Sequence, residues 1–368
     1  MLQKKFFVAA MGLLSFTLAE AQIASVVTDS TAAPVPEEEK KAPVLAITGS
    51  VDGYYKYDFG KTTANSFTSF TQTHNAFSLG MASLKFEHKG EKVSAVADLG
   101  FGPRAESFSY TDNGITQAIK QLYVSYAPTD WLKFTLGTWG THVGYELLDP
   151  QLNRNYSMSY MFTNGPFSHT GLKAEVSKGK HGVMLGIANA TDFRIPPDGY
   201  INKKFLLAQY SFAASDNVKF FLNYVSGQNP DTSKTNQFDA VVTAKISDKF
   251  NIGYNGTINS TQFWDGTKNT ESLAWWGSAL YLNFDPKPWF GLTLRGEYFS
   301  DKNNLKIAVN PDGCNIFATT LSANFKSGGF TFIPEFRLDN SNKDTFVDKD
   351  GVYKKAAANF LIAAVYSF

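Results

Sequence analysis

From Val44 onward, apolar and polar residues alternate along the chain with a period of two. In the segment 47–59, for example, Ile47, Val51 and Tyr55 share one face, and Thr48 lies on the other. Successive side chains of a β-strand point to opposite sides, so this pattern predicts strands with one apolar and one polar face. About sixteen such runs can be traced, near residues 47–59, 74–88, 91–101, 115–127, 131–141, 169–177, 181–190, 203–213, 217–226, 238–246, 250–258, 271–284, 289–300, 316–326, 330–338 and 357–368.

Two of these runs depart from a simple alternation. In 74–88 the apolar set changes phase around Ser83, and in 271–284 both faces are apolar. The strand count therefore depends most on these two segments.

The connections between the predicted strands alternate between short and long. The short ones contain the Gly, Asp, Asn or Pro residues of tight hairpins and lie at 88–91, 128–130, 178–179, 215–217, 247–249, 285–288 and 327–329. The others span about 10 to 28 residues, which is the asymmetry of a transmembrane barrel with short periplasmic turns and long extracellular loops. We therefore expect an all-β, antiparallel transmembrane β-barrel of about 16 strands with both ends in the periplasm. A soluble β-sandwich or jelly roll is the alternative, but it has no reason to alternate loop lengths.

The polar face of each strand is expected to line the interior of the barrel. A charged side chain on the lipid face near the bilayer midplane costs about 2–4 kcal/mol, whereas one on the inner face does not. Charged residues occupy the polar phase in nearly every run. Sixteen closed strands leave no unpaired edge in the hydrocarbon and leave room for a water-filled channel.

The final run has apolar residues at alternate positions, Phe360, Ile362, Ala364, Tyr366 and Phe368. It resembles the terminal signature of outer-membrane β-barrels, whose last strand is read by the barrel assembly machinery. Tyr366 and Phe368 are thus candidates for an assembly signal. A soluble all-β protein that ends in Phe is the alternative.

The first residues predict a secretory signal peptide over 1–21. Lys4 and Lys5 are followed by the apolar run 6–18, and Ala19-Glu20-Ala21 supplies a small-x-small cleavage site. The stretch 22–43 is rich in Ala, Pro, Glu and Lys, which predicts a disordered periplasmic lead. The barrel is expected to occupy 44–368.

Composition excludes several other classes of protein. No later apolar run approaches the ~20 residues of a transmembrane helix. Without Lys4, Lys5 and Glu20, the 34 basic and 33 acidic residues fall to 32 of each, which argues against a nucleic-acid partner. Cys314 is the single cysteine and has no metal-binding spacing. Aromatic residues at 15% suit strands with aromatic belts at two membrane interfaces.

Three stretches resemble the OmpL-like β-barrel porins of outer membranes: residues 49–59 (GSVDGYYKYDF), residues 98–104 (DLGFGPR), and residues 155–157 (NYS) with 165–171 (GPFSHTG). The resemblance covers roughly 45–368. It implies a multi-pass protein of the outer membrane of a Gram-negative bacterium that passes small hydrophilic solutes by diffusion. No cofactor is expected, and assembly of several copies stays open.

The longest connection, 142–168, is the candidate constriction, because in general porins the third outside loop folds into the barrel. Selectivity in such a loop comes from local charges and pore width. A loop that covers the mouth or exposes its tyrosines to solvent is the alternative. The candidate constriction residues are Glu146, Asp149, Arg154, Tyr156 and Tyr160.

Charged residues on the polar phase of the strands are candidate pore-lining residues. They are Lys133, Lys173, Glu175, Arg295, Glu297, Glu335 and Arg337. Arg295/Glu297 and Glu335/Arg337 are each two positions apart and hence on one face of a strand. Such pairs either set a field across the pore or form wall ion pairs that keep the lumen hydrated.

Other chemistry has weaker support. Trp131, Trp139, Trp264, Trp275, Trp276 and Trp289 lie mostly near predicted strand ends and fit interfacial belts, with a sugar-stacking lane as the alternative. His142 and His169 lack a fixed metal-binding spacing. A barrel hydrolase would need Ser157, Ser159 or Ser168 to meet one of these histidines, without matching a known motif. A non-conducting adhesin or structural anchor also remains open.

Overall fold

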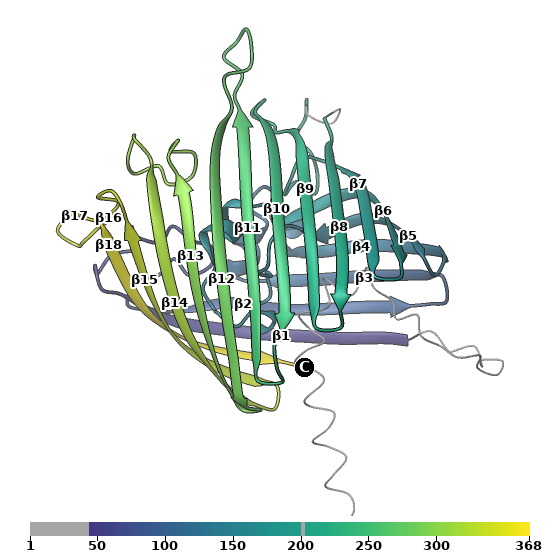
Figure 1. Ribbon diagram of the computed structural model, residues 1–368, viewed down its shortest axis with the longest axis horizontal. Helices are drawn as coiled ribbons and strands as arrows, with labels where there is room; N and C mark the ends of the chain where they lie inside the picture. Colours follow the sequence, from purple (N-terminus) through teal and green to yellow (C-terminus); the bar gives the residue numbers. More distant parts are fainter. Residues whose placement is uncertain (1–43, 200–202) are drawn as a thin grey trace, which may run out of the picture.

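The computed structural model describes residues 44–199 and 203–368, which form one closed antiparallel β-barrel (Figure 1). Residues 1–21 and 22–43, the predicted signal peptide and lead, lie outside the described residues. The strands of the barrel are β1 (Val44–Asp58), β2 (Ala76–Lys89), β3 (Val93–Phe101), β4 (Ile119–Thr129), β5 (Leu132–Gly140), β6 (Ser168–Lys178), β7 (His181–Ala188), β8 (Phe205–Ser215), β9 (Val218–Gln228), β10 (Lys234–Lys245), β11 (Phe250–Gln262), β12 (Leu273–Lys287), β13 (Phe290–Asp301), β14 (Cys314–Ser327), β15 (Phe330–Ser341) and β18 (Ala356–Ser367). The predicted count of sixteen strands is confirmed.

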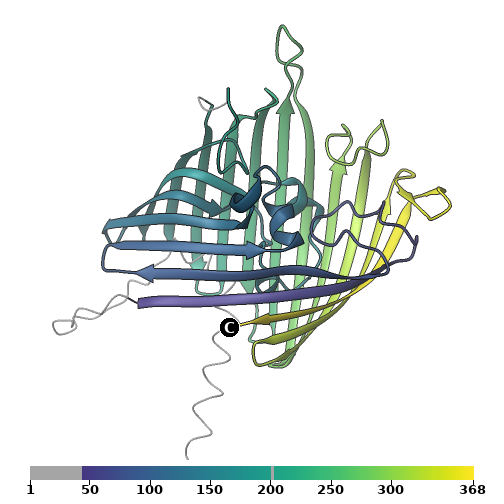
Figure 2. The ribbon, with the colours of Figure 1, turned by 180° about the vertical axis from the view of Figure 1, so that it is seen from behind.

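The barrel closes where β1 pairs with β18. Their register runs from Ser50 opposite Ser367 to Asp58 opposite Asn359. Gly49 and Phe368 extend this seam with two backbone hydrogen bonds, of 3.0 and 3.1 Å. Strands β1–β4 are strongly inclined to β9–β12 on the opposite wall (Figures 1 and 2).

The phase change in the second strand is a β-bulge. Val51 pairs with Ala82 and Gly53 with Leu79, so two residues of β2, Gly80 and Met81, lie opposite the single residue Asp52. The change is therefore a few residues earlier than Ser83. The Asp52 carboxylate accepts the Met81 N–H (2.9 Å), and a side chain at position 80 would collide with that carboxylate.

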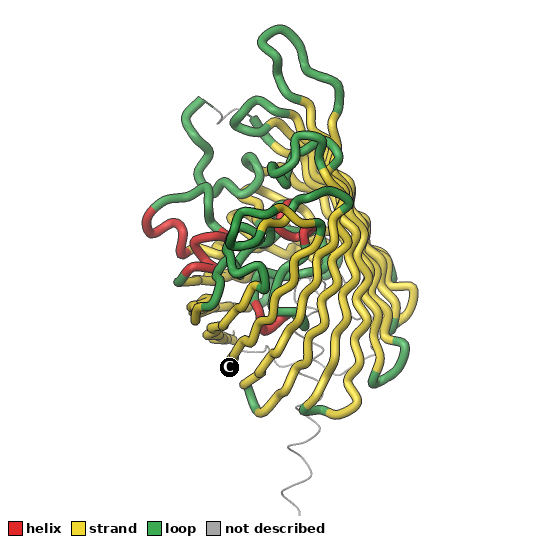
Figure 3. Tube along the Cα trace, turned by 90° about the vertical axis from the view of Figure 1, so that its left-hand side faces the viewer, coloured by secondary structure: helices red, strands yellow, loops and turns green. Residues whose placement is uncertain are grey.

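The connections alternate in length as predicted, with long loops at one end of the barrel and short turns at the other (Figure 3). Two boundaries differ from the prediction. Strands β9 and β10 pair as far as Gln228 and Lys234, so their loop shrinks to 229–233, because polar residues continue the ladder after the apolar alternation stops. Asp285 belongs to β12 rather than to the turn, because a bulge after Phe284 carries the strand to Lys287.

Short helices and a short two-stranded ribbon lie within the long connections. They are α2 (Pro103–Phe108), η1 (Gly114–Ala118), η2 (Pro150–Leu152), α3 (Tyr160–Asn164) and the ribbon β16 (Phe346–Val347) with β17 (Tyr353–Lys354). The predicted run 115–127 therefore begins as η1 before it becomes β4. Among the described residues, no helix is long and apolar enough to span a bilayer.

Apolar side chains on the outer face are exposed in nearly every strand, as a lipid contact requires. Examples are Phe77, Leu136, Leu185, Leu222, Phe238, Phe317 and Phe360. The charged residues of the strands mostly take the opposite phase and point inward. This arrangement confirms the predicted division between a lipid face and an inner face.

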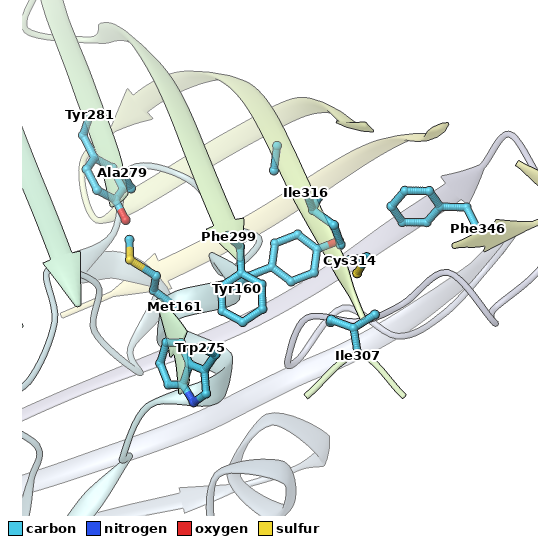
Figure 4. Close-up of a cluster of buried hydrophobic side chains, with 11 residues drawn as sticks. Tyr160, Met161, Trp275, Ala279, Tyr281, Phe299, Ile307, Cys314, Ile316 and Phe346 are labelled. Atoms are coloured by element: carbon cyan, nitrogen blue, oxygen red, sulfur yellow. The ribbon is translucent and has the colours of Figure 1, made fainter. Parts of the chain in front are cut away.

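Strand β12 is apolar on both faces because its inner face packs against a loop. Trp275, Ala279 and Tyr281 point inward and form a buried cluster with Tyr160 and Met161 of the connection between β5 and β6 (Figure 4). The Trp275 and Phe299 ring centroids lie 5.4 Å apart, and Phe299 stacks on Tyr160 at the same distance. The barrel interior thus has an apolar core along part of its wall.

Candidate functional site

The connection between β5 and β6, residues 141–167, crosses the interior of the barrel. We call it the lumen loop. Its first limb, 141–149, contacts walls that lie on different sides of the barrel. The contacts are Thr141 with His169 on β6, His142 with the Tyr224 carbonyl on β9, Gly144 N–H with Asp239 on β10, Tyr145 N–H with Asn255 on β11, Glu146 with Arg295 on β13, and Asp149 with Lys120 on β4.

In the second limb, two wall carboxylates each bind two successive backbone N–H groups. Glu335 on β15 accepts from Tyr156 (2.8 Å) and Ser157 (3.2 Å). Glu297 on β13 accepts from Tyr160 (2.9 Å) and Met161 (2.8 Å), the first residues of α3. The first N–H groups of a helix have no partner within it, so Glu297 satisfies donors that would otherwise be unpaired. We call these two contacts the carboxylate clamps.

Two wall arginines bind the carbonyl groups of the same segment. Arg295 donates to the Ser157 carbonyl (2.8 Å) as well as to Glu146. Arg337 donates to the Met158 carbonyl (2.7 Å) and pairs with Asp339 (2.8 Å). The wall therefore binds both the donors and the acceptors of the loop backbone over residues 156–161.

Two tyrosines of the loop contact strands close to the β1–β18 seam. The Tyr156 hydroxyl donates to Asp52 on β1, and the Tyr160 hydroxyl donates to Asp339 on β15 (2.9 Å). Arg104 of α2 lies between two rings, 4.8 Å from the Tyr156 centroid and 4.9 Å from that of Phe70. These contacts attach the loop to β1, β15 and α2 near the β1–β18 seam.

The polar groups beneath the loop are shielded from water but are paired. Arg295 and Glu297 are 0% exposed, and Glu335 and Arg337 are 1% and 3% exposed. Removal of one partner from such a pair costs about 3–5 kcal/mol, because the other charge stays buried. The clamps and arginines therefore fix the loop position strongly.

The sequence of this chain matches the family described as "Putative beta-barrel porin-2, OmpL-like" over residues 44–368. The chain belongs to this OmpL-like porin family. A comparison with curated protein sequences gave no match.

Solved structures similar to the OmpL-like chain are outer-membrane barrels of low sequence identity. They include the outer membrane channel DcaP of Acinetobacter baumannii (TM-score 0.61, 13% identity, 90% of this chain and 99% of that one). A second is OmpT of Vibrio cholerae in its trimer form (TM-score 0.60, 10% identity, 89% of this chain and 100% of that one). The anion-selective porin of Comamonas acidovorans is a third (TM-score 0.57, 10% identity, 89% and 100%). Family, closed sheet and apolar outer face together identify an outer-membrane β-barrel of a Gram-negative bacterium.

In this OmpL-like barrel, the charged loop residues have partners that the sequence reveals only in part. Glu146 pairs with Arg295, one of the expected wall cations. Asp149 pairs with Lys120, which was not among the predicted pore-lining residues. Arg154 forms a two-pronged pair with Asp285 (2.8 and 2.6 Å) near the turn end of β12.

The wall pairs Arg295/Glu297 and Glu335/Arg337 point inward as expected, but neither interpretation of them describes their contacts. They do not face open water, because the lumen loop covers them. Their charges bind the loop backbone rather than each other. Arginine and glutamate alternate along β13 and β15. The glutamates accept from N–H groups of the loop, and the arginines donate to its carbonyl groups.

Lys133, Lys173 and Glu175 lie together on β5 and β6, on a different part of the wall. Glu175 contacts both Lys133 (2.9 Å) and Lys173 (3.5 Å), and Lys173 lies 5.1 Å from the Trp139 ring centroid. The lysine side chains are 30% and 15% exposed, in contrast to the covered arginines. Two ammonium groups thus meet one carboxylate where water reaches the wall.

Several residues missed in the sequence complete the site. Besides Lys120 and Asp285, they are Asp52, Asp339, Arg104 and the connection 59–75, where Ser69 N–H donates to Thr163 (2.9 Å). Asp52 and Lys120 have an inward-facing charge in a strand, which was a usable signal. Nothing local identifies their partners, which lie far along the chain.

The outer end of the lumen loop joins β6 through a buried carboxylate. Asp192, in the connection 189–204, accepts the N–H groups of Phe167 (2.7 Å) and Ser168 (2.8 Å). Burial raises the pKa of Asp192 to about 6, although these N–H groups, Tyr110 and Arg194 lower it. The charge of Asp192 in turn raises the pKa of Tyr110.

The tryptophans divide into two groups. Trp131, Trp264, Trp276 and Trp289 are exposed, in agreement with outer belts or loop tips. Trp139 and Trp275 are 4% and 0% exposed, point inward and pack within the protein, so their assignment to a belt was wrong. Their burial also leaves no stacking surface for a sugar on these two rings.

His142, Ser157 and Ser159 of the lumen loop, and His169 of β6, have other contacts. The rings of His142 and His169 are 5.3 Å apart, and among the described residues no group of three or more His, Cys, Asp or Glu could hold a metal. The Ser159 hydroxyl accepts the Phe162 N–H (3.0 Å), and the Ser157 hydroxyl contacts Arg295 (3.5 Å). These contacts do not match the hydrolase geometry considered from the sequence.

Proposed function

We propose that this protein is a porin that lets small hydrophilic solutes diffuse across the outer membrane through the barrel, without a cofactor or covalent chemistry. The support comes from family membership and from the polar, charged inner wall. The observation that carries the mechanism is the lumen loop, which crosses the interior and controls how much of the cross-section remains. Lumen width and charge would then decide which solutes pass.

The part of the wall best placed to influence ions is the Lys133/Lys173/Glu175 group. These lysines are partly exposed, whereas Arg295 and Arg337 are covered. The Comamonas acidovorans structure is titled an anion-selective porin, and the lysine excess here favours the same preference in this chain. Low-dielectric walls concentrate such a field.

The decisive experiment is single-channel recording in planar bilayers with the intact chain and with a chain in which residues 147–159 are replaced by a short Gly-Ser linker. We expect the shortened loop to raise conductance several-fold, because Tyr156, Met158 and the backbone segment bound by Glu335 no longer fill the interior. A matched control shortens the exposed hairpin 264–269, outside the interior, and should leave conductance unchanged.

A barrel without conduction, serving as an adhesin or anchor, is the second candidate, and the covered inner wall favours it. If neither the intact nor the shortened chain gives current steps, this candidate replaces the porin. Liposome swelling measured beside ester and peptide hydrolysis tests the hydrolase alternative. Swelling without hydrolysis supports the porin.

We also infer that the barrel associates with copies of itself. The OmpT structure of Vibrio cholerae is described in a trimer form, and its fold resembles this one. Cross-linking in isolated outer membranes followed by electrophoresis should give a discrete oligomer. A monomer under these conditions would contradict the inference.

A further inference from the structure

We propose that the structure shows a closed state, in which lumen loop segment 154–161 is a gate that must leave the β13–β15 wall before solutes pass. This inference rests on the proposed porin function and adds regulation to it. A fixed constriction leaves the charges of the wall exposed to water, whereas a closed gate covers them. The contacts of the loop distinguish the two cases.

The contacts of the lumen loop extend around the inside of the barrel. The lumen loop contacts β4, β6, β9, β10, β11 and β13 through its first limb. Through its second limb it contacts β1, β12, β13, β14 and β15, where Asn155 donates to Ser322 on β14 (2.6 Å). Tyr156 also packs against Leu361, Ala363 and Val365 of β18. The loop thus touches most of the circumference.

Side chains that would border an open passage are buried. On β14, Thr320 and Ser322 are 0% exposed; farther along the sheet, on β10 and β11, Asp239 and Asn255 are 4% and 3% exposed. A constriction that works by charge needs its charges in contact with water and ions. Here the charges of β13 and β15 contact the loop backbone instead.

The polar contacts between the gate and the wall can be exchanged for contacts with water. The clamps and arginines bind the main chain of the gate, and water can replace each of these backbone hydrogen bonds when the segment leaves. Buried charged groups without a partner would be costly, but a wall exposed to a water-filled lumen hydrates them. The apolar packing of Tyr160, Met161, Trp275 and Phe299 acts against release and makes the closed state the resting one.

A reversible disulfide tests whether the segment must move. In a Cys314→Ser background, Asn155→Cys with Ser322→Cys joins the gate to β14, at a pair whose side chains already touch. The control joins two neighbouring strands with Ser125→Cys and Thr135→Cys, whose hydroxyls are 2.9 Å apart on the inner wall. Folding of each variant is verified by heat-modifiable electrophoretic mobility.

We expect oxidation of the gate pair to lower conductance at least ten-fold and a reductant to restore it, while the control pair is unaffected. Equal conductance of the oxidised and reduced gate pair would overturn the gate and leave the porin function intact. If the reduced pair is silent but the chain lacking 147–159 conducts, the seal is supported. Silence of both would remove the porin function and the gate together.

A second variant tests the clamps without a cross-link. Glu297→Gln with Glu335→Gln keeps the shape but replaces each two-acceptor carboxylate by a group with one acceptor and one donor facing the loop N–H groups. We expect the open probability to rise about ten-fold at unchanged single-channel conductance. An unchanged open probability in a folded variant would show that the clamps do not hold the gate.

Discussion

At the scale of single residues, the lumen loop is held by groups whose partners come from distant strands. Tyr156 and Asp52 are 104 positions apart, and their hydrogen bond links the loop to the first strand. Asp52 also accepts the Met81 N–H at the β2 bulge and lies 4.0 Å from Arg104. One carboxylate thus connects the bulge, a short helix and the loop.

Tyr156→Phe should lower the free energy of unfolding by about 1–3 kcal/mol, because Asp52 stays buried and loses one donor. Urea titration followed by heat-modifiable mobility measures the change. Tyr366→Phe is the matched control, since Tyr366 is exposed on the outer face and should have little effect. A loss of equal size in both variants would contradict the role of the buried hydrogen bond.

At the scale of elements, the seam between β1 and β18 has a specific requirement for glycine. A β-carbon at Gly49 would lie 2.6 Å from the Phe368 ring and 2.9 Å from the Ser83 carbonyl. The absence of a side chain on β1 therefore lets the aromatic ring of Phe368 lie against the seam. Tyr366 and Phe368, the candidate assembly signal, occupy this seam.

Gly49→Val and Phe368→Ala should each reduce the folded, heat-modifiable protein in the outer membrane, the first through a collision and the second through loss of the ring. The protein level is measured by electrophoresis of membrane fractions without boiling. Ser367→Ala, at the neighbouring position, is the control. Unchanged folded levels in both variants would show that ring packing at the seam does not contribute to assembly.

At the scale of the whole molecule, charge is distributed unevenly over the inner wall. On the β13–β15 side, Arg295 and Arg337 lie among carboxylates, and the loop covers them. The β5–β6 side carries Lys133 and Lys173 around Glu175, with part of each lysine exposed. Ion preference should therefore depend on the second region rather than on the first.

Lys133→Gln with Lys173→Gln should shift ion selectivity toward cations by several-fold, because a narrow polar passage between low-dielectric walls concentrates the remaining field. Reversal potentials in a KCl gradient measure the shift. Lys178→Gln, at the exposed end of β6, is the control. A shift of the same size in the control would indicate a general surface effect.

The sequence by itself determined the barrel, the inward and outward faces, the strand number and the identity of the longest loop. These features are local, because a period of two, a turn residue or a loop length is visible within one segment. The signal came from side-chain alternation in runs such as 238–246 and 330–338. It failed at element ends, where β9 and β10 continue with polar residues.

Only the tertiary structure decided where the lumen loop lies and which residues it meets. Asp149 pairs with Lys120, Trp275 turns inward, and Glu297 binds N–H groups of α3. Each outcome depends on the register of strands that are far apart in the chain and on closure of the sheet, which bring the partners together. Because alternation specifies a face but not a neighbour, these contacts could be determined only in the closed barrel.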